Sequence, residues 1–158
     1  MNAQQGSKKF ILTKEGLEHL KLEHEKLTKV IRPQIAQRIQ TAREFGDLAE
    51  NTEYDAAKEE QSLIEARIAQ IEEVLPKAQL IQQAKGADIV VIGSTVVVAM
   101  NDEIHEFSIV GSMEADPAKN KISNESPVGK SLLGLKAGET IEVGIGPVTS
   151  KLKVLEIK

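Results

Sequence analysis

The fold is decided where a long helical pattern is interrupted, in the stretch 43-REFGDLAENTEYDAAKEE-60. Seven residues of this stretch are acidic, and only two, Arg43 and Lys58, are basic. Gly46 is the expected end of the first helix, because glycine readily takes the left-handed conformation that closes a helix. We therefore expect one helix on each side of a short acidic connection.

The residues before this connection carry an apolar stripe at alternating helical spacings of three and four. Its members are Leu17, Leu20, His24, Leu27, Ile31, Ile35, Ile39 and Ala42. Thr13 is the expected N-cap of this helix. Pro33 predicts a bend near Arg32, because proline lacks the N–H group of a helical hydrogen bond.

The residues after the connection carry a second stripe, with the spacing of a heptad seam. Its members are Ala57, Gln61, Ile64, Ile68, Ile71 and Leu75. Two seams joined by a short connection predict an antiparallel coiled-coil hairpin over residues 1–84, with its acidic tip near residues 46–51.

The pattern changes in residues 85–158, where β-branched runs with a period of two predict strands. The expected strands are 88–92, 95–99, 105–110, 140–143 and 150–157. Ser126 as N-cap and Pro127 as the first helical residue predict a short helix over 126–133. We expect an α+β fold: the helical hairpin, then a small α+β domain with an antiparallel sheet.

Composition excludes several classes of protein. The chain has no cysteine, which excludes disulfides, zinc thiolate sites and cysteine nucleophiles. A net charge of -4 argues against a protein that binds nucleic acid through bulk charge. No apolar run approaches the roughly 20 residues of a membrane span, and the first residues lack the apolar region of a signal peptide. We therefore expect a cytoplasmic protein without a membrane partner.

Asp47 and Glu50 have two interpretations. The first is a capping box, with Asp47 as N-cap and Glu50 three residues later. The second starts from Asn51, which is an equally good N-cap and would leave both acids free. Free carboxylates this close repel each other unless a cation lies between them, and Mg²⁺ prefers oxygen ligands. The second interpretation predicts a weak Mg²⁺ site that another molecule completes.

Several motifs resemble those of the bacterial Gre transcript-cleavage factors. They are Arg32-Pro33, Arg43-Glu44-x-Gly46-Asp47-Leu48-x-Glu50-Asn51-x-Glu53-Tyr54-x-Ala56-Ala57-Lys58-Glu59-x-Gln61, Ile109-Val110-Gly111, Glu114-Ala115-Asp116, Ile122-Ser123 and Ser126-Pro127-Val128-Gly129-Lys130. The resemblance spans nearly the whole chain. It is to the GreA type rather than to GreB, whose helices carry a larger basic patch.

The resemblance implies a specific partner and mechanism. An FKBP-like domain, here residues 85–158, would dock on RNA polymerase at the mouth of its secondary channel, which the coiled coil would enter. Asp47 and Glu50 would help to hold a shared Mg²⁺ for hydrolysis of backtracked RNA near its 3′ end. The polymerase would remain the enzyme, and the factor, expected to be a monomer, would rescue arrested complexes.

Other residues of the motif have less specific roles. Asn51, Tyr54 and Arg43 are candidates for orienting substrate or water, although Tyr54 could equally pack at the end of the seam. Arg38, Arg43 and Lys58 could contact RNA phosphates or pair with nearby glutamates.

Three other functions compete with this one. A polymerase-channel regulator that does not promote cleavage is disfavoured, because such relatives alter the tip acids and this chain has both. A coiled-coil chaperone or adaptor predicts an apolar tip, where only Phe45 and Leu48 qualify. An autonomous nuclease is disfavoured because no basic groove accompanies the two carboxylates.

Overall fold

The structure, a computed structural model, describes residues 9–46, 51–81 and 86–158. These residues form two compact units. One unit is Leu17–Lys77, and the other combines the described residues up to Gly16 with Ala78–Lys158. The sequence predicted a single boundary near residue 84, where the pattern changes. The two units do not meet at one such boundary, because the strand before the helices pairs with the strand after them.

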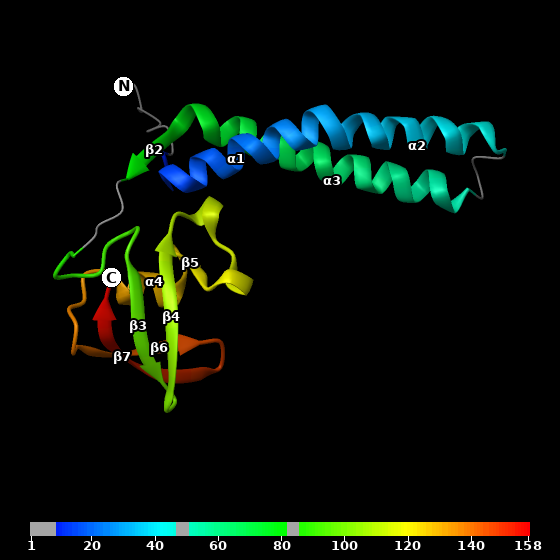
Figure 1. Ribbon diagram of the computed structural model, residues 1–158. Coiled ribbons are helices and arrows are strands. Elements are labelled where there is room, and N and C mark those ends of the chain that lie inside the picture. Colours follow the sequence, from blue (N-terminus) through cyan, green and yellow to red (C-terminus); the bar gives the residue numbers. More distant parts are fainter. Residues whose placement is uncertain (1–8, 47–50, 82–85) are drawn as a thin grey trace, which may run out of the picture. The chain divides into compact units, whose positions relative to one another are not determined.

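The first long helix consists of α1 (Lys14–Lys26), a π turn (Leu27–Ile31) and α2 (Arg32–Glu44), which follow one another without a break (Figure 1). The hydroxyl of Thr13 accepts a hydrogen bond from the Gly16 amide at 2.9 Å, which confirms the predicted N-cap. The Arg32 amide donates to the Leu27 carbonyl, five residues back. A bend was predicted near Arg32 and Pro33, and the structure instead has a π turn that ends at Ile31, two residues before Pro33.

Helix α3 (Thr52–Val74) runs antiparallel to α2 (Figure 1) and ends in a 3-10 turn, Leu75–Lys77, which contains Pro76. The buried residues of the two helices come mainly from the predicted stripes. They are Ile35, Ile39 and Ala42 from α2, and Ala57, Ile68, Ile71 and Val74 from α3. The antiparallel helical hairpin is confirmed. No described helix has the length and apolar character needed to cross a bilayer.

Forked ion pairs connect the two sides of the hairpin. Arg67 donates two hydrogen bonds to Glu23, at 2.6 and 2.8 Å, and Arg32 donates two to Glu65, both at 2.7 Å. The hydrogen bonds from Arg67 and its positive charge hold the pKa of Glu23 below its ordinary value. The Glu23–Arg67 pair therefore makes the stability of the hairpin depend on pH.

Replacing Glu23 by glutamine is expected to destabilise the hairpin by less than about 1 kcal/mol at pH 7, because the pair is partly exposed. A carboxyl whose pKa is lowered by folding stabilises the protein above its unfolded pKa of about 4.3, and that contribution disappears as the pH falls through the folded pKa. Urea unfolding followed by helical circular dichroism should therefore separate the two proteins at pH 7 but not near pH 3. A difference that persists at pH 3 would assign the contribution to packing instead.

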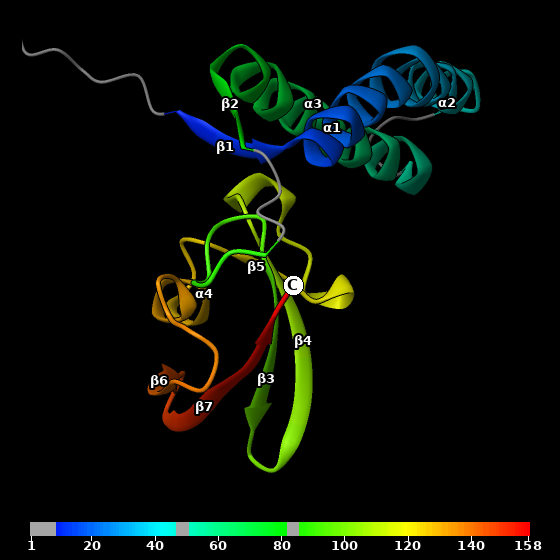
Figure 2. The same ribbon diagram turned by 60° about the vertical axis from the view of Figure 1, so that its left-hand side comes forward.

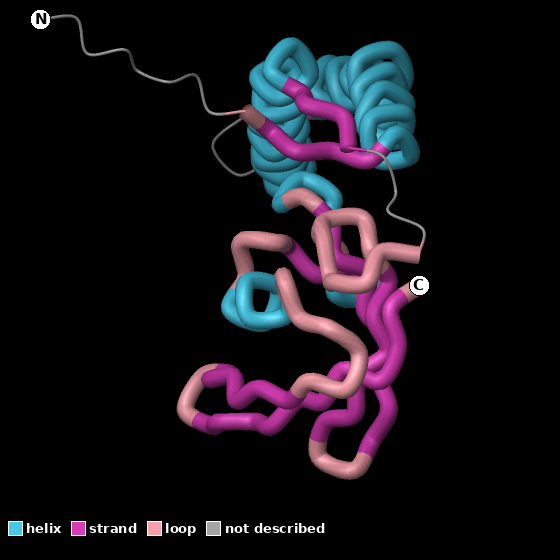
Figure 3. Tube along the Cα trace, turned by 90° about the vertical axis from the view of Figure 1, so that its left-hand side faces the viewer, coloured by secondary structure: helices cyan, strands magenta, loops and turns pink. Residues whose placement is uncertain are grey.

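The second unit contains a five-stranded sheet in the order β5-β4-β3-β7-β6. Its strands are magenta in Figure 3. The strands are β3 (Thr95–Met100), β4 (Glu103–Val110), β5 (Lys121–Ser123), β6 (Thr140–Ile145) and β7 (Val148–Ile157). Neighbouring strands are antiparallel except β4 and β5, which are parallel. The α+β class is confirmed, and the expected antiparallel sheet has one parallel pair at its edge.

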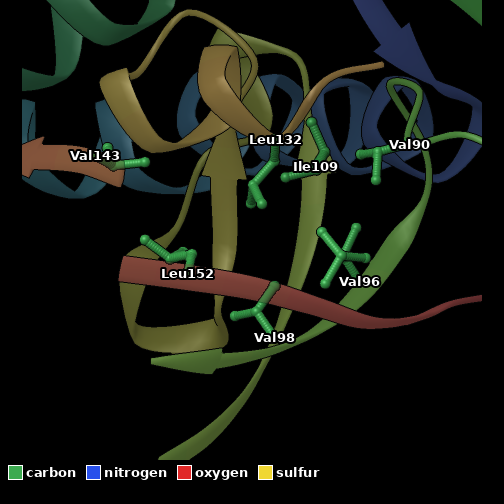
Figure 4. Packing of buried hydrophobic residues seen from close by; sticks show 8 residues of the cluster. Val90, Val96, Val98, Ile109, Leu132, Val143 and Leu152 are labelled. Atoms are coloured by element: carbon green, nitrogen blue, oxygen red, sulfur yellow. The ribbon is translucent and has the colours of Figure 1, made fainter. Parts of the chain in front are cut away.

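Helix α4 (Pro127–Leu132) packs on this sheet and closes its core. The hydroxyl of Ser126 accepts a hydrogen bond from the Gly129 amide at 3.0 Å, as the predicted N-cap should. The core is aliphatic (Figure 4). Its buried residues are Val90, Val96, Val98, Ile109, Leu132, Val143, Leu152 and Val154.

Three parts of the strand prediction differ from the structure. Residues 88–92 form no strand and contribute only an isolated bridge from Ile89 to Lys136. Val90 is buried there because its amide and carbonyl bond to Leu135 and Gly134, in the segment after α4. The prediction also omitted the edge strand β5. It further omitted β1 (Phe10–Thr13) and β2 (Ala78–Ile81), which pair in parallel as a separate two-stranded sheet (Figure 2).

Strand β1 is held against residues that follow β4. The carboxylate of Glu114 accepts hydrogen bonds from both the amide and the hydroxyl of Thr13. A β-carbon on Gly111 would lie 1.8 Å from the Ile11 carbonyl oxygen, so only glycine permits this approach of the two backbones.

Candidate functional site at the end of the helical hairpin

The first long helix ends close to the predicted position. Helix α2 ends at Glu44, and Phe45 is its C-cap, with an amide that donates to the Ala42 carbonyl. Gly46 follows with a φ angle of 134°, in the positive region that favours glycine. The helix thus ends two residues before Gly46, and the predicted special conformation of that glycine is confirmed.

Asn51 joins the two helices at this end. Its side-chain oxygen accepts a hydrogen bond from the Tyr54 amide at 3.1 Å, which makes it the N-cap of α3. Its side-chain nitrogen donates to the Ala42 carbonyl, near the end of α2, at 2.7 Å. The choice between two N-caps is therefore settled for Asn51. The second hydrogen bond also ties the start of α3 to the end of α2.

Asp47 and Glu50 lie outside the described residues, so the Mg²⁺ site assigned to them stays a prediction. Their described neighbours are Gly46 and Asn51, which the end of α2 and the start of α3 place on either side of the connection. The described part of the chain contains no group of three or more side chains able to hold a metal ion.

The two faces of α2 near this end differ in charge. On one face, Arg38 bonds to both Glu53 and Glu60, and these bonds raise its pKa further above the ordinary value. On the other face, Arg43 and the nearby Lys58 of α3 have no ion-pair partner among the residues that the structure describes. Arg38 is one of the three basic residues considered as contacts for RNA phosphates, and its charge is neutralised by glutamates within the hairpin.

The face with Arg43 and Lys58 is hollowed into an open groove of about 470 Å³, which also includes Gln61. The amine of Lys58 donates a hydrogen bond to Gln61 at 2.7 Å. The Arg43 guanidinium lies over the Tyr54 ring, 5.8 Å from the ring centre, where the ring attracts its charge. The lining of the groove therefore includes two basic residues, Arg43 and Lys58, and one acidic residue, Glu44.

Tyr54 packs at the end of the seam, against the cluster of Ile35, Ile39 and Ala57. This is one of the two roles considered for it, and a role in orienting substrate stays a prediction. The sequence patterns did not identify the cross-helix bond of Asn51, and they offered pairing of Arg38 with nearby glutamates only as one of two interpretations, without naming Glu53 and Glu60. Both depend on how α2 and α3 are aligned, and no local motif reports that alignment.

Replacing Asn51 by alanine is expected to destabilise the hairpin by about 1–2 kcal/mol, because the N-cap of α3 is lost. Replacement by serine supplies a capping hydroxyl without the amide nitrogen, so Asn51→Ser should recover most of the cap but not the bond to Ala42. Urea unfolding followed by circular dichroism measures both variants. Equal losses for alanine and serine would show that the bond to Ala42, rather than the cap, is the larger contribution.

Comparisons with known proteins agree with this architecture. Residues 10–80 match the family described as the N-terminal domain of transcription elongation factors, and residues 84–158 match the C-terminal domain of GreA/GreB. The transcription elongation factor GreA of Caldanaerobacter subterraneus subsp. tengcongensis is 53% identical over 156 residues, or 96% of this chain and 99% of that protein. GreA of Thermomicrobium roseum is 47% identical over 149 residues, or 93% and 96% of the two chains.

Among solved structures, the GreA factor homolog 1 protein of Thermus thermophilus is 28% identical, covering 96% of this chain and 99% of that one, with a TM-score of 0.45. That score is too low to support an argument about the fold. The family assignment rests on the sequence matches, which together span both units. The chain belongs to the GreA/GreB family of transcription elongation factors.

Proposed function

We propose that this transcription elongation factor enters the secondary channel of RNA polymerase and stimulates the polymerase to hydrolyse backtracked RNA. The observation that carries the proposal is the N-cap of α3. Because Asn51 caps this helix, Asp47 and Glu50 are not required for capping and remain available as ligands. Membership of the GreA/GreB family supports the polymerase as the partner.

The residues of the connection fit the requirements of Mg²⁺. Asp47 and Glu50 provide carboxylate oxygens, the ligands that Mg²⁺ prefers, and two such ligands leave positions open for groups of the polymerase and RNA. The bound ion would lower the pKa of a water molecule and stabilise charge on the phosphate under attack. In this proposal the chain supplies ligands to the polymerase site, and the polymerase remains the enzyme.

The described residues near the connection have supporting roles. Arg43 and Lys58 have no ion-pair partner among the described residues, so we propose that they contact the phosphates of the backtracked RNA. Asn51 acts as a positioning residue, because one donor and one acceptor of its side chain are used to join α2 and α3. The factor is proposed to act as a cytoplasmic monomer, with its second unit docked on the polymerase.

The test uses purified polymerase stalled in a backtracked state on RNA labelled at its 5′ end. Adding the factor with Mg²⁺ should shorten the labelled RNA and release short 3′ fragments, after which elongation resumes. RNA and factor without polymerase should show no cleavage, and appreciable cutting there would indicate an autonomous nuclease. Binding to polymerase without any shortening of the RNA would indicate the regulator that does not promote cleavage.

A further inference from the structure

We propose that Phe45 is a stacking platform for one unpaired base of the backtracked RNA. This inference rests on the proposed function and adds a contact with substrate to it. The contact is made by an uncharged surface on the face of α2 opposite to Arg43.

The first observation is the exposure of Phe45. Its side chain is 84% exposed, the highest value among the large apolar side chains of the described residues. Its backbone is nevertheless held in place, because its amide donates to the Ala42 carbonyl and it directly follows the last residue of α2. A large apolar ring exposed to solvent is costly to hydrate, which favours a partner that covers it.

The second observation is the groove beside Phe45, about 340 Å³ in volume. It is lined by Gln37, Arg38, Thr41, Ala42, Phe45, Asn51 and Glu53. Its only charged lining residues, Arg38 and Glu53, form an ion pair at 2.8 Å, and Arg38 is further neutralised by Glu60. A phosphate would therefore find no free positive charge among these lining residues.

The two grooves lie on opposite sides of α2. The groove that contains Arg43 and Lys58 is lined on α2 by residues 36, 39, 40, 43 and 44. The groove beside Phe45 is lined on α2 by residues 37, 38, 41, 42 and 45. At 3.6 residues per turn these two sets point in opposite directions. The hairpin end thus has two basic residues and one acidic residue on one side, and a groove with an exposed aromatic side chain and no unpaired charge on the other.

An unpaired nucleobase fits the neutral side. It is flat and uncharged, and it stacks on aromatic side chains in most proteins that bind single-stranded nucleic acid. Such stacking tolerates any base, because every base presents an aromatic face. Phe45 lies two positions before Asp47, and Asn51 lies one position after Glu50. A base stacked on Phe45 would therefore lie at the residue that is two positions from the first of the proposed Mg²⁺ ligands in the sequence.

The test measures the factor-stimulated cleavage rate for Phe45→Ala, Phe45→Trp and Leu63→Ala. Leu63 is a matched control, because it is 66% exposed on α3 and is absent from the linings of both grooves. Each protein is assayed with two RNAs, one intact and one whose displaced 3′ nucleotides lack bases. Because Phe45→Ala loses the stacking of one base, its factor-stimulated cleavage rate on intact RNA should be about tenfold lower than that of the unaltered protein.

Three results together support the proposal. Phe45→Trp and Leu63→Ala keep the rate of the unaltered protein, and Phe45→Ala and the unaltered protein cleave the abasic RNA equally. An unchanged rate for Phe45→Ala on intact RNA would overturn the proposal, and so would an equal loss on both RNAs, which indicates a structural role. If the unaltered protein itself fails to stimulate cleavage, the proposed function fails and this inference fails with it.

Discussion

Replacing Asp47 or Glu50 by alanine is expected to lower the factor-stimulated rate of RNA cleavage by about 100-fold. Each substitution removes one of the two carboxylates proposed to hold Mg²⁺, and the remaining one is too weak a ligand to retain the ion. Docking should be unaffected, because both residues lie outside the second unit that we assign to polymerase binding. RNA length against time gives the rate, and co-sedimentation with polymerase gives binding.

A matched control is Glu59→Ala, which removes an exposed acid of the same stretch from within α3. This variant should stimulate cleavage like the unaltered protein. Raising the Mg²⁺ concentration should recover part of the activity of Glu50→Ala, because mass action offsets a weaker site. If Asp47→Ala and Glu50→Ala both stimulate normally, these residues do not bind the ion and the metal hypothesis is wrong.

Replacing Gly111 by alanine is expected to destabilise the second unit by about 3 kcal/mol, as overpacking against a rigid backbone does. The added β-carbon would lie 1.8 Å from the carbonyl oxygen of Ile11, and no side-chain rotation relieves a clash between backbone atoms. Either β1 or the segment after β4 must move, and movement of β1 also disturbs the bonds of Thr13 to Glu114.

Gly144→Ala provides the control for this substitution. Gly144 lies in β6, it has no positive φ angle, and nothing lies within 4 Å of the β-carbon it would gain. Alanine there should be neutral or slightly stabilising, because it restricts the unfolded chain. Thermal unfolding followed by circular dichroism compares the two variants. Equal midpoints for them would contradict the close approach of β1 to Gly111.

The helices could be predicted from the sequence because their signals are local. The two apolar stripes, the caps Thr13 and Ser126, and Gly46 at the helix end each depend on residues within a few positions of one another. The small sheet could not be predicted, because Phe10 pairs with Ala78 across the whole hairpin. Residues 88–92 were wrongly predicted as a strand. Val90 is buried in a loop whose backbone bonds to another loop, and a β-branched run has the same sequence pattern in a buried loop as in a strand.

The candidate site was predicted in part. The choice of Asp47 and Glu50 came from their residue types, their spacing and the competing cap at Asn51, all of which are visible in the sequence. Which cations are free could not be predicted, because Arg38 is neutralised by Glu53 and Glu60 on a different helix. The sequence showed Phe45 near the tip, but the neutral groove beside it forms only when α2 and α3 align.

The π turn at Leu27–Ile31 has a consequence for the phase of the seam. Leu27, Ile31, Ile35 and Ile39 follow one another at intervals of four. On a regular helix with 3.6 residues per turn, each such interval overshoots by about 40°, and three of them would rotate the apolar stripe about 120° away from its partner. The wider π turn absorbs part of that rotation. The π turn ends at Ile31, so it changes the rotation of the first interval alone, and the overshoot over the other two intervals stays within the width of one cluster formed by Ile31, Ile35 and Ile39 with Ala57 and Ile64.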